Sequence, residues 1–186
     1  AIQAWRDHGL GVNEPDERVQ IAAVDVPDDG RFHVGFKAAD NGDGTWRYEY
    51  AVHNLSSDLA AGSFTVPVPV GVTVTDLHFH DVPHHSGEPY SDQDWSESIT
   101  SDAVAWTDES VIDNSNGNAI RWGTMYSFGF TADAPPASAD ATIGLFGNGS
   151  SIDVMVDAPS APVNPCDINQ DGVDDVNDTV IGLGHV

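Results

Sequence analysis

The chain has 186 residues, of which 40% are hydrophobic, and this composition supports a folded core and argues against general disorder. Six Lys and Arg residues stand against thirty Asp and Glu residues, so the formal net charge is −24. A surface this acidic repels phosphate backbones and anionic headgroups, so we expect no nucleic acid partner. No apolar run approaches the ~18 residues of a membrane-spanning helix, and we expect no membrane insertion.

The N-terminal sequence and the cysteine content indicate a compartment. Ala1-Ile2-Gln3 is a start that cleavage of a signal peptide after a small residue can leave, so we expect a secreted, extracellular protein. Cys166 is the one cysteine, which excludes an internal disulfide. A single thiol serves either as a small apolar side chain or in an intermolecular bond, and both roles stay open.

The first thirty residues form an N-terminal segment with room for one short helix in the first twenty. Residues 31–36 and 45–52 alternate between apolar and polar side chains around a turn signal at 40–44, which predicts a β-hairpin. Residues 63–70 are also extended, but their prolines cannot donate ladder hydrogen bonds, which predicts an edge strand or a strand end. Further strands are expected at 72–79, 103–106, 119–122, 125–132, 141–146 and 152–156.

Short strands separated by turn signals are typical of an antiparallel β-sandwich. We therefore predict an all-β sandwich domain for residues 1–156, with an immunoglobulin-like arrangement and a jelly roll both open. Residues 157–166 are rich in proline, which favours an extended, semi-rigid linker. Residues 167–186 then form a short C-terminal appendage.

The appendage opens with oxygen-bearing side chains at the spacing of a calcium-binding loop. Gly172 falls at the sixth position, where such a loop bends sharply. The predicted calcium ligands are Asp167, Asn169, Asp171, the Val173 carbonyl, Asp175 and Asp178. Calcium takes six to eight oxygen ligands, so this spacing can wrap the set around one Ca2+ ion.

The run Cys-Asp-Ile-Asn-Gln-Asp-Gly-Val-Asp-Asp-Val-Asn-Asp resembles the calcium-binding repeat of type I dockerins, an EF-hand-like loop with Asp at its twelfth position. In that family a short helix follows the loop, and here Thr179 would begin it. Dockerins carry two such repeats, which pack together and bind cohesins, and residues 167–186 hold one. The resemblance implies a docking face, covered by the sandwich or by another molecule, that consists of Val176, Val180, Ile181 and Leu183.

The body of the chain carries a second resemblance. Residues 118–128 and Ala134-Pro135-Pro136 are similar to a secreted bacterial β-domain of planctomycete-like proteins, a group of unknown activity. This resemblance implies export and leaves the activity open.

Together these features predict an extracellular, calcium-binding structural or adhesive module at the cell surface. Without Ca2+ the five aspartates at 167–178 repel one another, whereas Ca2+ neutralises them and orders the docking segment. The expected partners are copies of the chain or another surface protein, and the expected self-assembly depends on Ca2+.

The alternative function is a carbohydrate-binding module of a secreted polysaccharide-degrading system. The rings available for stacking on sugars are those of Tyr90, Trp95, Trp106, Trp122 and Tyr126, although burial is the commoner use of such side chains in a sandwich. Acidic residues near Trp95 leave a glycoside hydrolase as the minority prediction. No nucleophile elbow, phosphate loop or triad spacing is present, so we do not expect an enzyme.

Two further sets of side chains are candidate sites. Four histidines within eight residues can form a second metal site or a hydrogen-bonded strand end, and a metalloenzyme that uses them is a further minority prediction. They are His78, His80, His84 and His85. Three Asn-X-Ser/Thr patterns offer glycan attachment at Asn54, Asn148 and Asn177.

Overall fold

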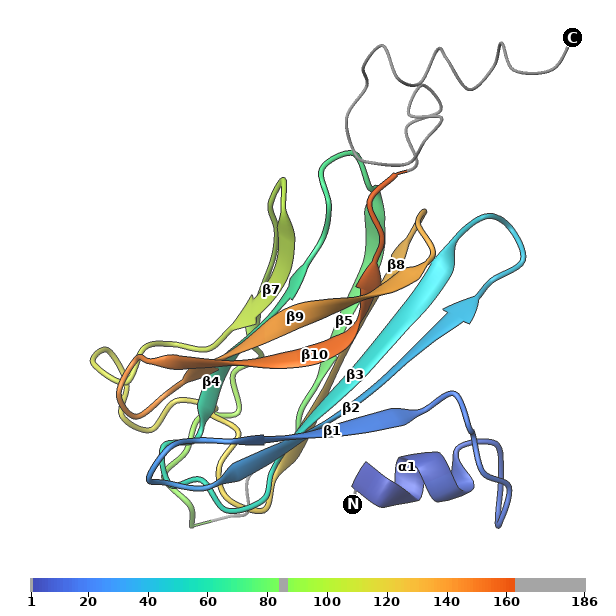
Figure 1. The fold of residues 1–186 in the computed structure, drawn as a ribbon. Coiled ribbons are helices and arrows are strands. Elements are labelled where there is room, and N and C mark those ends of the chain that lie inside the picture. Colours follow the sequence, from blue (N-terminus) through green and yellow to red (C-terminus); the bar gives the residue numbers. More distant parts are fainter. Residues whose placement is uncertain (1, 84–86, 163–186) are drawn as a thin grey trace, which may run out of the picture.

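The structure is a computed structural model that describes residues 2–83 and 87–162. Within these residues ten strands form two five-stranded antiparallel sheets that pack face to face (Figure 1). The order in the first sheet is β1 (Gln20–Asp25), β2 (Arg31–Asp40), β3 (Trp46–Asn54), β8 (Met125–Ala132) and β5 (Val74–His80). The order in the second sheet is β10 (Ser151–Pro159), β9 (Pro136–Leu145), β4 (Ala61–Pro67), β7 (Ala103–Thr107) and β6 (Ser96–Ile99). The predicted all-β sandwich is confirmed.

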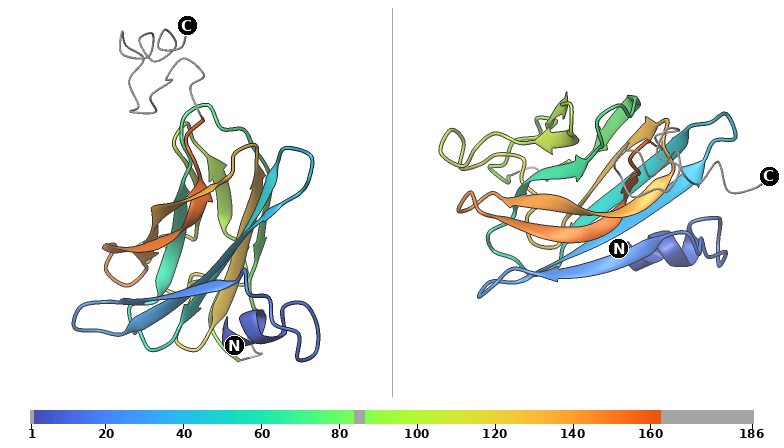
Figure 2. Two further views of the ribbon diagram at one scale, coloured as in Figure 1. Left: turned by 45° about the vertical axis from the view of Figure 1, so that its right-hand side comes forward. Right: turned by 45° about the horizontal axis from the view of Figure 1, so that its top comes forward.

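Aromatic rings fill the space between the two sheets. Figure 2 shows the two sheets from two further sides. The Phe128 ring of β8 lies centrally, with its centroid 5.1 Å from that of Phe64 and 5.3 Å from that of Trp106. Tyr48 and Tyr50 of β3 are also buried, and their hydroxyls donate to the Ala134 and Asp157 carbonyls at 2.8 and 2.7 Å. Each buried ring of this size contributes roughly 2–3 kcal/mol through the area removed from water.

The predicted strands are found with three differences. β1 and β6 were not predicted, because β1 is only half-buried and all four residues of β6 are exposed, so neither shows a clear alternation. The strand predicted at 119–122 is wrong: Ile120 makes one isolated bridge to Ala61, and the segment belongs to the connection between β7 and β8.

The prolines of residues 63–70 mark a strand end and not an edge. β4 lies in the middle of its sheet, between β9 and β7, and Pro67 is its last residue. A proline at that position removes no hydrogen bond from the interior of the ladder, which is why a central strand tolerates it.

The sandwich extends further toward the C-terminus than predicted. β10 continues to Pro159, so residues 157–159 pair with β9 and do not belong to the linker. The Ser160 amide then donates to the Pro135 carbonyl at 2.8 Å, and Pro162 lies beside Gly71. The described chain therefore leaves the sandwich at the end where β5 begins.

The N-terminal segment packs on the outer face of the first sheet. The short helix α1 (Ile2–His8) places Ile2 and Trp5 over Gly35, where an added Cβ would lie 3.1 Å from both side chains. Further along, the carboxylate of buried Asp16 accepts hydrogen bonds from Arg18 Nε and Nη2 at 2.8 and 2.9 Å. In the described part of the chain, no helix is long and apolar enough to cross a membrane.

Candidate functional site

The predicted calcium loop and docking face lie outside the described residues. This applies to Asp167, Asn169, Asp171, Val173, Asp175, Asp178, Val176, Val180, Ile181 and Leu183, and also to Cys166 and Asn177. Their roles stay predictions based on the sequence.

Two of the four clustered histidines can be placed. His78 and His80 lie on the outward side of β5, because Phe79 between them points into the core. His78 Nδ1 lies 2.7 Å from Arg47 Nη2, and burial together with this guanidinium lowers the pKa of His78. A neutral imidazole that accepts a hydrogen bond from arginine has committed one of its two ring nitrogens.

His84 and His85 lie outside the described residues, so the four-histidine metal site stays untested. Among residues 2–83 and 87–162, no group of three or more His, Cys, Asp or Glu side chains is arranged to hold a metal ion. Of the two placed histidines, His78 is hydrogen-bonded to Arg47.

The glycan attachment predictions differ in their outcome. Asn54 is fully buried: its Nδ2 donates to the Ser57 and Ile120 carbonyls at 2.9 and 3.0 Å, and its Oδ1 accepts the Ser57 amide. Such an amide is not accessible to a modifying enzyme in the folded chain, so attachment at Asn54 does not fit this structure. Asn148 is exposed in the turn between β9 and β10 and stays a prediction.

The predicted aromatic platform separates into core and surface members. Trp95, Trp106 and Tyr126 are at most 3% exposed and pack around Phe128, so these three residues do not form a platform. Trp122 is 70% exposed, the largest aromatic side chain among the exposed hydrophobic residues. Tyr90 is half-buried. Only Trp122 and Tyr90 are thus available at the surface.

Trp122 and Tyr90 come from two long connections that lie together at one end of the sandwich. Residues 81–95 join β5 to β6, and residues 108–124 join β7 to β8. Because His80 pairs with Ser127, the end of β5 and the start of β8 are adjacent. This end is opposite to the one where the described chain leaves the sandwich beside Gly71.

Asn118 fastens the two connections to each other. Its side chain is fully buried, and its Nδ2 donates to the Gln93 carbonyl at 3.0 Å and to a carboxylate oxygen of Asp81. Its Oδ1 accepts the Tyr126 hydroxyl at 2.6 Å, and its carbonyl accepts Trp95 Nε1 at 2.6 Å. Burial raises the pKa of Tyr126, so this hydroxyl stays protonated and donates.

A tight turn at residues 121–124 presents Trp122 to solvent. The Thr124 amide and Thr124 Oγ1 both donate to the Arg121 carbonyl, at 3.0 and 2.7 Å. Gly123 has a φ of 80°, as the third residue of a type II turn requires. The backbone of Asn54 holds the turn in place, because its carbonyl accepts the Gly123 amide and its backbone N–H donates to the Thr124 carbonyl.

Arg121 joins Trp122 to Tyr90. Its guanidinium carbon lies 3.8 Å from the centroid of the Tyr90 ring and 5.5 Å from that of Phe146. Its Nη2 donates to the Ser115 and Gly117 carbonyls at 3.3 and 3.1 Å. The charge of Arg121 is thus directed into the protein, and its position is fixed from several sides.

A surface depression of about 340 Å³ lies between the two connections. Its lining, called the Trp122 depression below, consists of Val82, Pro83, Glu88, Tyr90, Arg121, Trp122 and Thr124. Small-ligand sites in proteins have volumes of roughly 300–1,000 Å³ and combine apolar surface with a few polar groups, so the Trp122 depression is of the right kind and at the lower limit of size.

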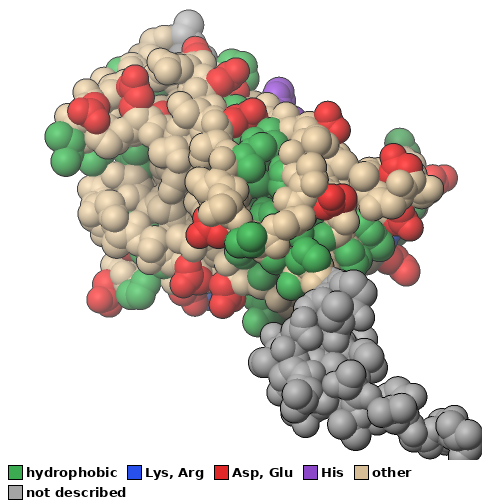
Figure 3. All heavy atoms as spheres, turned by 90° about the horizontal axis from the view of Figure 1, so that it is seen from above, with side chains coloured by type: hydrophobic (Ala, Val, Ile, Leu, Met, Phe, Trp, Pro, Cys, Tyr) green, Lys and Arg blue, Asp and Glu red, His purple; other side chains and the backbone are tan. Residues whose placement is uncertain are grey.

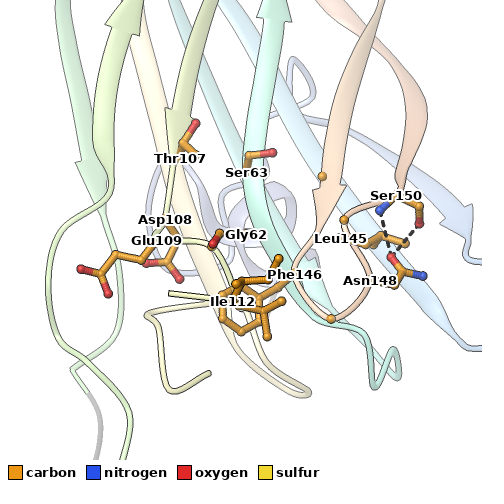
Figure 4. A pocket seen from close by; sticks show the side chains of 15 residues that line it. Gly62, Ser63, Thr107, Asp108, Glu109, Ile112, Leu145, Phe146, Asn148 and Ser150 are labelled. Atoms are coloured by element: carbon orange, nitrogen blue, oxygen red, sulfur yellow. Dashed lines mark hydrogen bonds between the residues drawn. The ribbon is translucent and has the colours of Figure 1, made fainter. Parts of the chain in front are cut away.

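A larger hollow, about 460 Å³, lies near the start of the β7–β8 connection (Figure 4). Burial raises the pKa of Asp108, one of its lining residues, and Asp108 Oδ2 has no hydrogen-bond partner. This oxygen faces Gly117, where an added Cβ would lie 2.6 Å from it, so it serves the packing of the loop. On the other side Asn148 Oδ1 accepts the amide and hydroxyl of Ser150. The contacts of Asp108 and Asn148 are thus with the protein's own loops.

No protein-family model, no curated protein sequence and no solved structure matches this chain. Its own side chains are therefore what indicates a function. Sequence reasoning missed the buried roles of Asn54 and Asn118, since an asparagine in a loop gives no sign of its burial. The Trp122-Gly123 pair was a usable turn signal.

Proposed function

We propose that the chain is an extracellular, non-catalytic module that docks through its C-terminal appendage when that appendage binds Ca2+. The observation that carries this proposal is the sequence of residues 167–178, in which every position that supplies a calcium ligand bears an oxygen donor and Gly172 occupies the bend. The partner is a second copy of the chain or another protein at the cell surface.

The described part of the chain supports this division of roles. Residues 2–83 and 87–162 enclose an aromatic core, so the sandwich does not need the appendage to cover its interior. The described chain ends beyond β10 at one end of the sandwich (Figure 1), and the appendage is joined to the sandwich there.

Charge explains why the docking depends on cations. Acidic side chains are spread over the end of the molecule shown in Figure 3, and basic ones are scarce there. With a net charge of −24, two copies repel each other unless cations bind or salt screens the field over the ~8–10 Å Debye length of physiological solutions. Calcium bound at the loop lowers this repulsion at the docking segment itself.

Calcium titration of the full chain by isothermal calorimetry tests the proposal. We expect one site of roughly 10⁻⁵–10⁻³ M, and Asp171→Asn lowers the affinity roughly tenfold or more, since it removes a charged ligand. Asp140→Asn, which removes an exposed carboxylate on β9, is the matched control and leaves the affinity unchanged.

Sedimentation velocity in Ca2+ and in EGTA tests docking separately from binding. We expect a larger species in Ca2+ with the wild type, alone or with a surface extract, and its loss in EGTA and with Asp171→Asn. Absence of calcium binding in the millimolar range, or assemblies indifferent to EGTA, would contradict the proposed function.

A further inference from the structure

The Trp122 depression lies at the end of the sandwich opposite to the point where the described chain leaves it. We propose that it binds a neutral polysaccharide, with one pyranose ring stacked on the Trp122 indole. This inference does not depend on the calcium-binding appendage, because every residue it uses belongs to the described residues of the sandwich.

The exposure of Trp122 is the first observation. Trp95 and Trp106 show that the core has room for indoles, yet Trp122 keeps 70% of its surface in water. A buried position is the commoner one for so large an apolar ring, and an exposed one costs hydrophobic free energy that a ligand can recover. A pyranose ring has an apolar C–H face that fits an indole and hydroxyls at its edge that need polar partners.

The rigidity of the turn at residues 121–124 is the second observation. Four backbone or side-chain hydrogen bonds hold the turn, two within it and two to Asn54. Arg121, the residue before Trp122, is packed against the Tyr90 ring at 3.8 Å. A platform held in this way loses little conformational entropy when a ligand binds, which is how a small contact area can still give measurable affinity.

The polar groups around the indole select the ligand. Glu88 supplies carboxylate oxygens and Thr124 a hydroxyl at the rim, and such groups accept hydrogen bonds from sugar hydroxyls. Among the described residues, Arg121 is the one cationic side chain that lines the Trp122 depression, and its Nη2 is engaged by two carbonyls. With no other cation among these described lining residues and a net charge of −24, a uronate or sulfated polymer is repelled, so a neutral one is expected.

Affinity electrophoresis of the full chain is the direct experiment. Native gels contain one soluble polymer each: laminarin, xyloglucan, galactomannan or pullulan as neutral probes, and alginate as the anionic probe. We expect retardation by at least one neutral polymer and none by alginate. Trp122→Ala lowers the affinity roughly tenfold or more, Trp122→Phe retains part of it, and thermal unfolding is unchanged for both.

Ile112→Ala is the matched control, because Ile112 is 91% exposed, belongs to the same connection and lies outside the Trp122 depression. It should bind like the wild type. Repeating the gels in EGTA should leave retardation unchanged, which separates this site from the calcium appendage. A wild type that no neutral polymer retards, tighter binding to alginate, or a Trp122→Ala variant that binds normally would overturn the inference.

Sedimentation velocity tests the other role that an exposed tryptophan can have, which is a contact between two protein chains. If Trp122→Ala dissociates an oligomer while no polymer retards the wild type, the ring serves a protein–protein contact and the sugar site is refuted.

Discussion

Asn118 and Trp122 belong to the same connection between β7 and β8, yet their environments are opposite. Asn118 is a polar side chain that is fully buried, and Trp122 is an apolar one that is 70% exposed. Asn118 uses its hydrogen bonds to tie the connection to residues 81–95, while Trp122 has its turn held in place by Asn54. The comparison indicates that the buried polar groups of this end are structural and that the exposed ring is the part available for binding.

Replacing a buried tryptophan, Trp95, and the exposed one, Trp122, should give the largest difference in the free energy of unfolding. Trp95→Ala removes a ring that contacts Phe79, Tyr126 and Phe128, and we expect it to lower the free energy of unfolding by about 3–5 kcal/mol. Trp122→Ala should change it by less than about 0.5 kcal/mol. Urea denaturation followed by circular dichroism measures both. Equal losses would mean that Trp122 is part of the fold and that the comparison is mistaken.

Asn118→Ala should have the next largest effect, because it breaks the link between the two connections. The substitution leaves the buried Tyr126 hydroxyl with only the Ala119 carbonyl at 3.5 Å and removes the donor to the Gln93 carbonyl, which belongs to an exposed residue. A buried polar group without a good partner costs about 1–3 kcal/mol, so we expect a loss of that size. Polysaccharide affinity should fall as well, since Tyr90 loses its fixed position relative to Trp122.

Asn116→Ala is the control for this prediction. Asn116 is exposed two residues earlier, and its carbonyl, which accepts the Ser91 amide at 2.8 Å, is kept in the variant. Denaturation curves should then match the wild type within about 0.5 kcal/mol. If Asn118→Ala unfolds like the Asn116 variant, the hydrogen bonds of Asn118 are not what holds this end together.

The fold was predictable to the extent that burial alternates along the strands. The alternation of residues 45–52 and 125–132 correctly indicated β3 and β8, because both lie inside a sheet with one face on the core. β6 gave no signal, since all its residues are exposed. Residues 119–122 were wrongly predicted as a strand because Ala119 and Ile120 are buried. They belong to a connection, and Ile120 makes only an isolated bridge to Ala61.

The site was predictable only as a set of residue types. Trp95, Trp106 and Trp122 look alike in the sequence, and what separates them is which loop packs over them in three dimensions. The buried positions of Asn54 and Asn118 depend on contacts with residues 66 and 37 positions away, respectively. No local pattern records such distant contacts, so the assembly of the Trp122 depression could not be derived from the chain alone.

Asp16 tests whether the structural role of buried polar groups holds beyond the loops. The hydrogen bond from Arg18, opposed by burial, lowers the pKa of Asp16 to about 2. A carboxyl group whose pKa is lower in the folded chain than its ordinary 3.8 stabilises the fold above that ordinary value, and this contribution disappears as the pH falls from about 5 to about 2. Because the Arg18 side chain is 55% exposed, solvent screening reduces the contribution to about 1–2 kcal/mol.

Asp16→Asn should therefore be less stable than the wild type by this amount at pH 7, and the difference in unfolding free energy should close near pH 2 in denaturation experiments. The exposed Asp140→Asn variant should show no such gap, and a deficit of Asp16→Asn that stays constant with pH would assign the role of Asp16 to its packing and not to its charge.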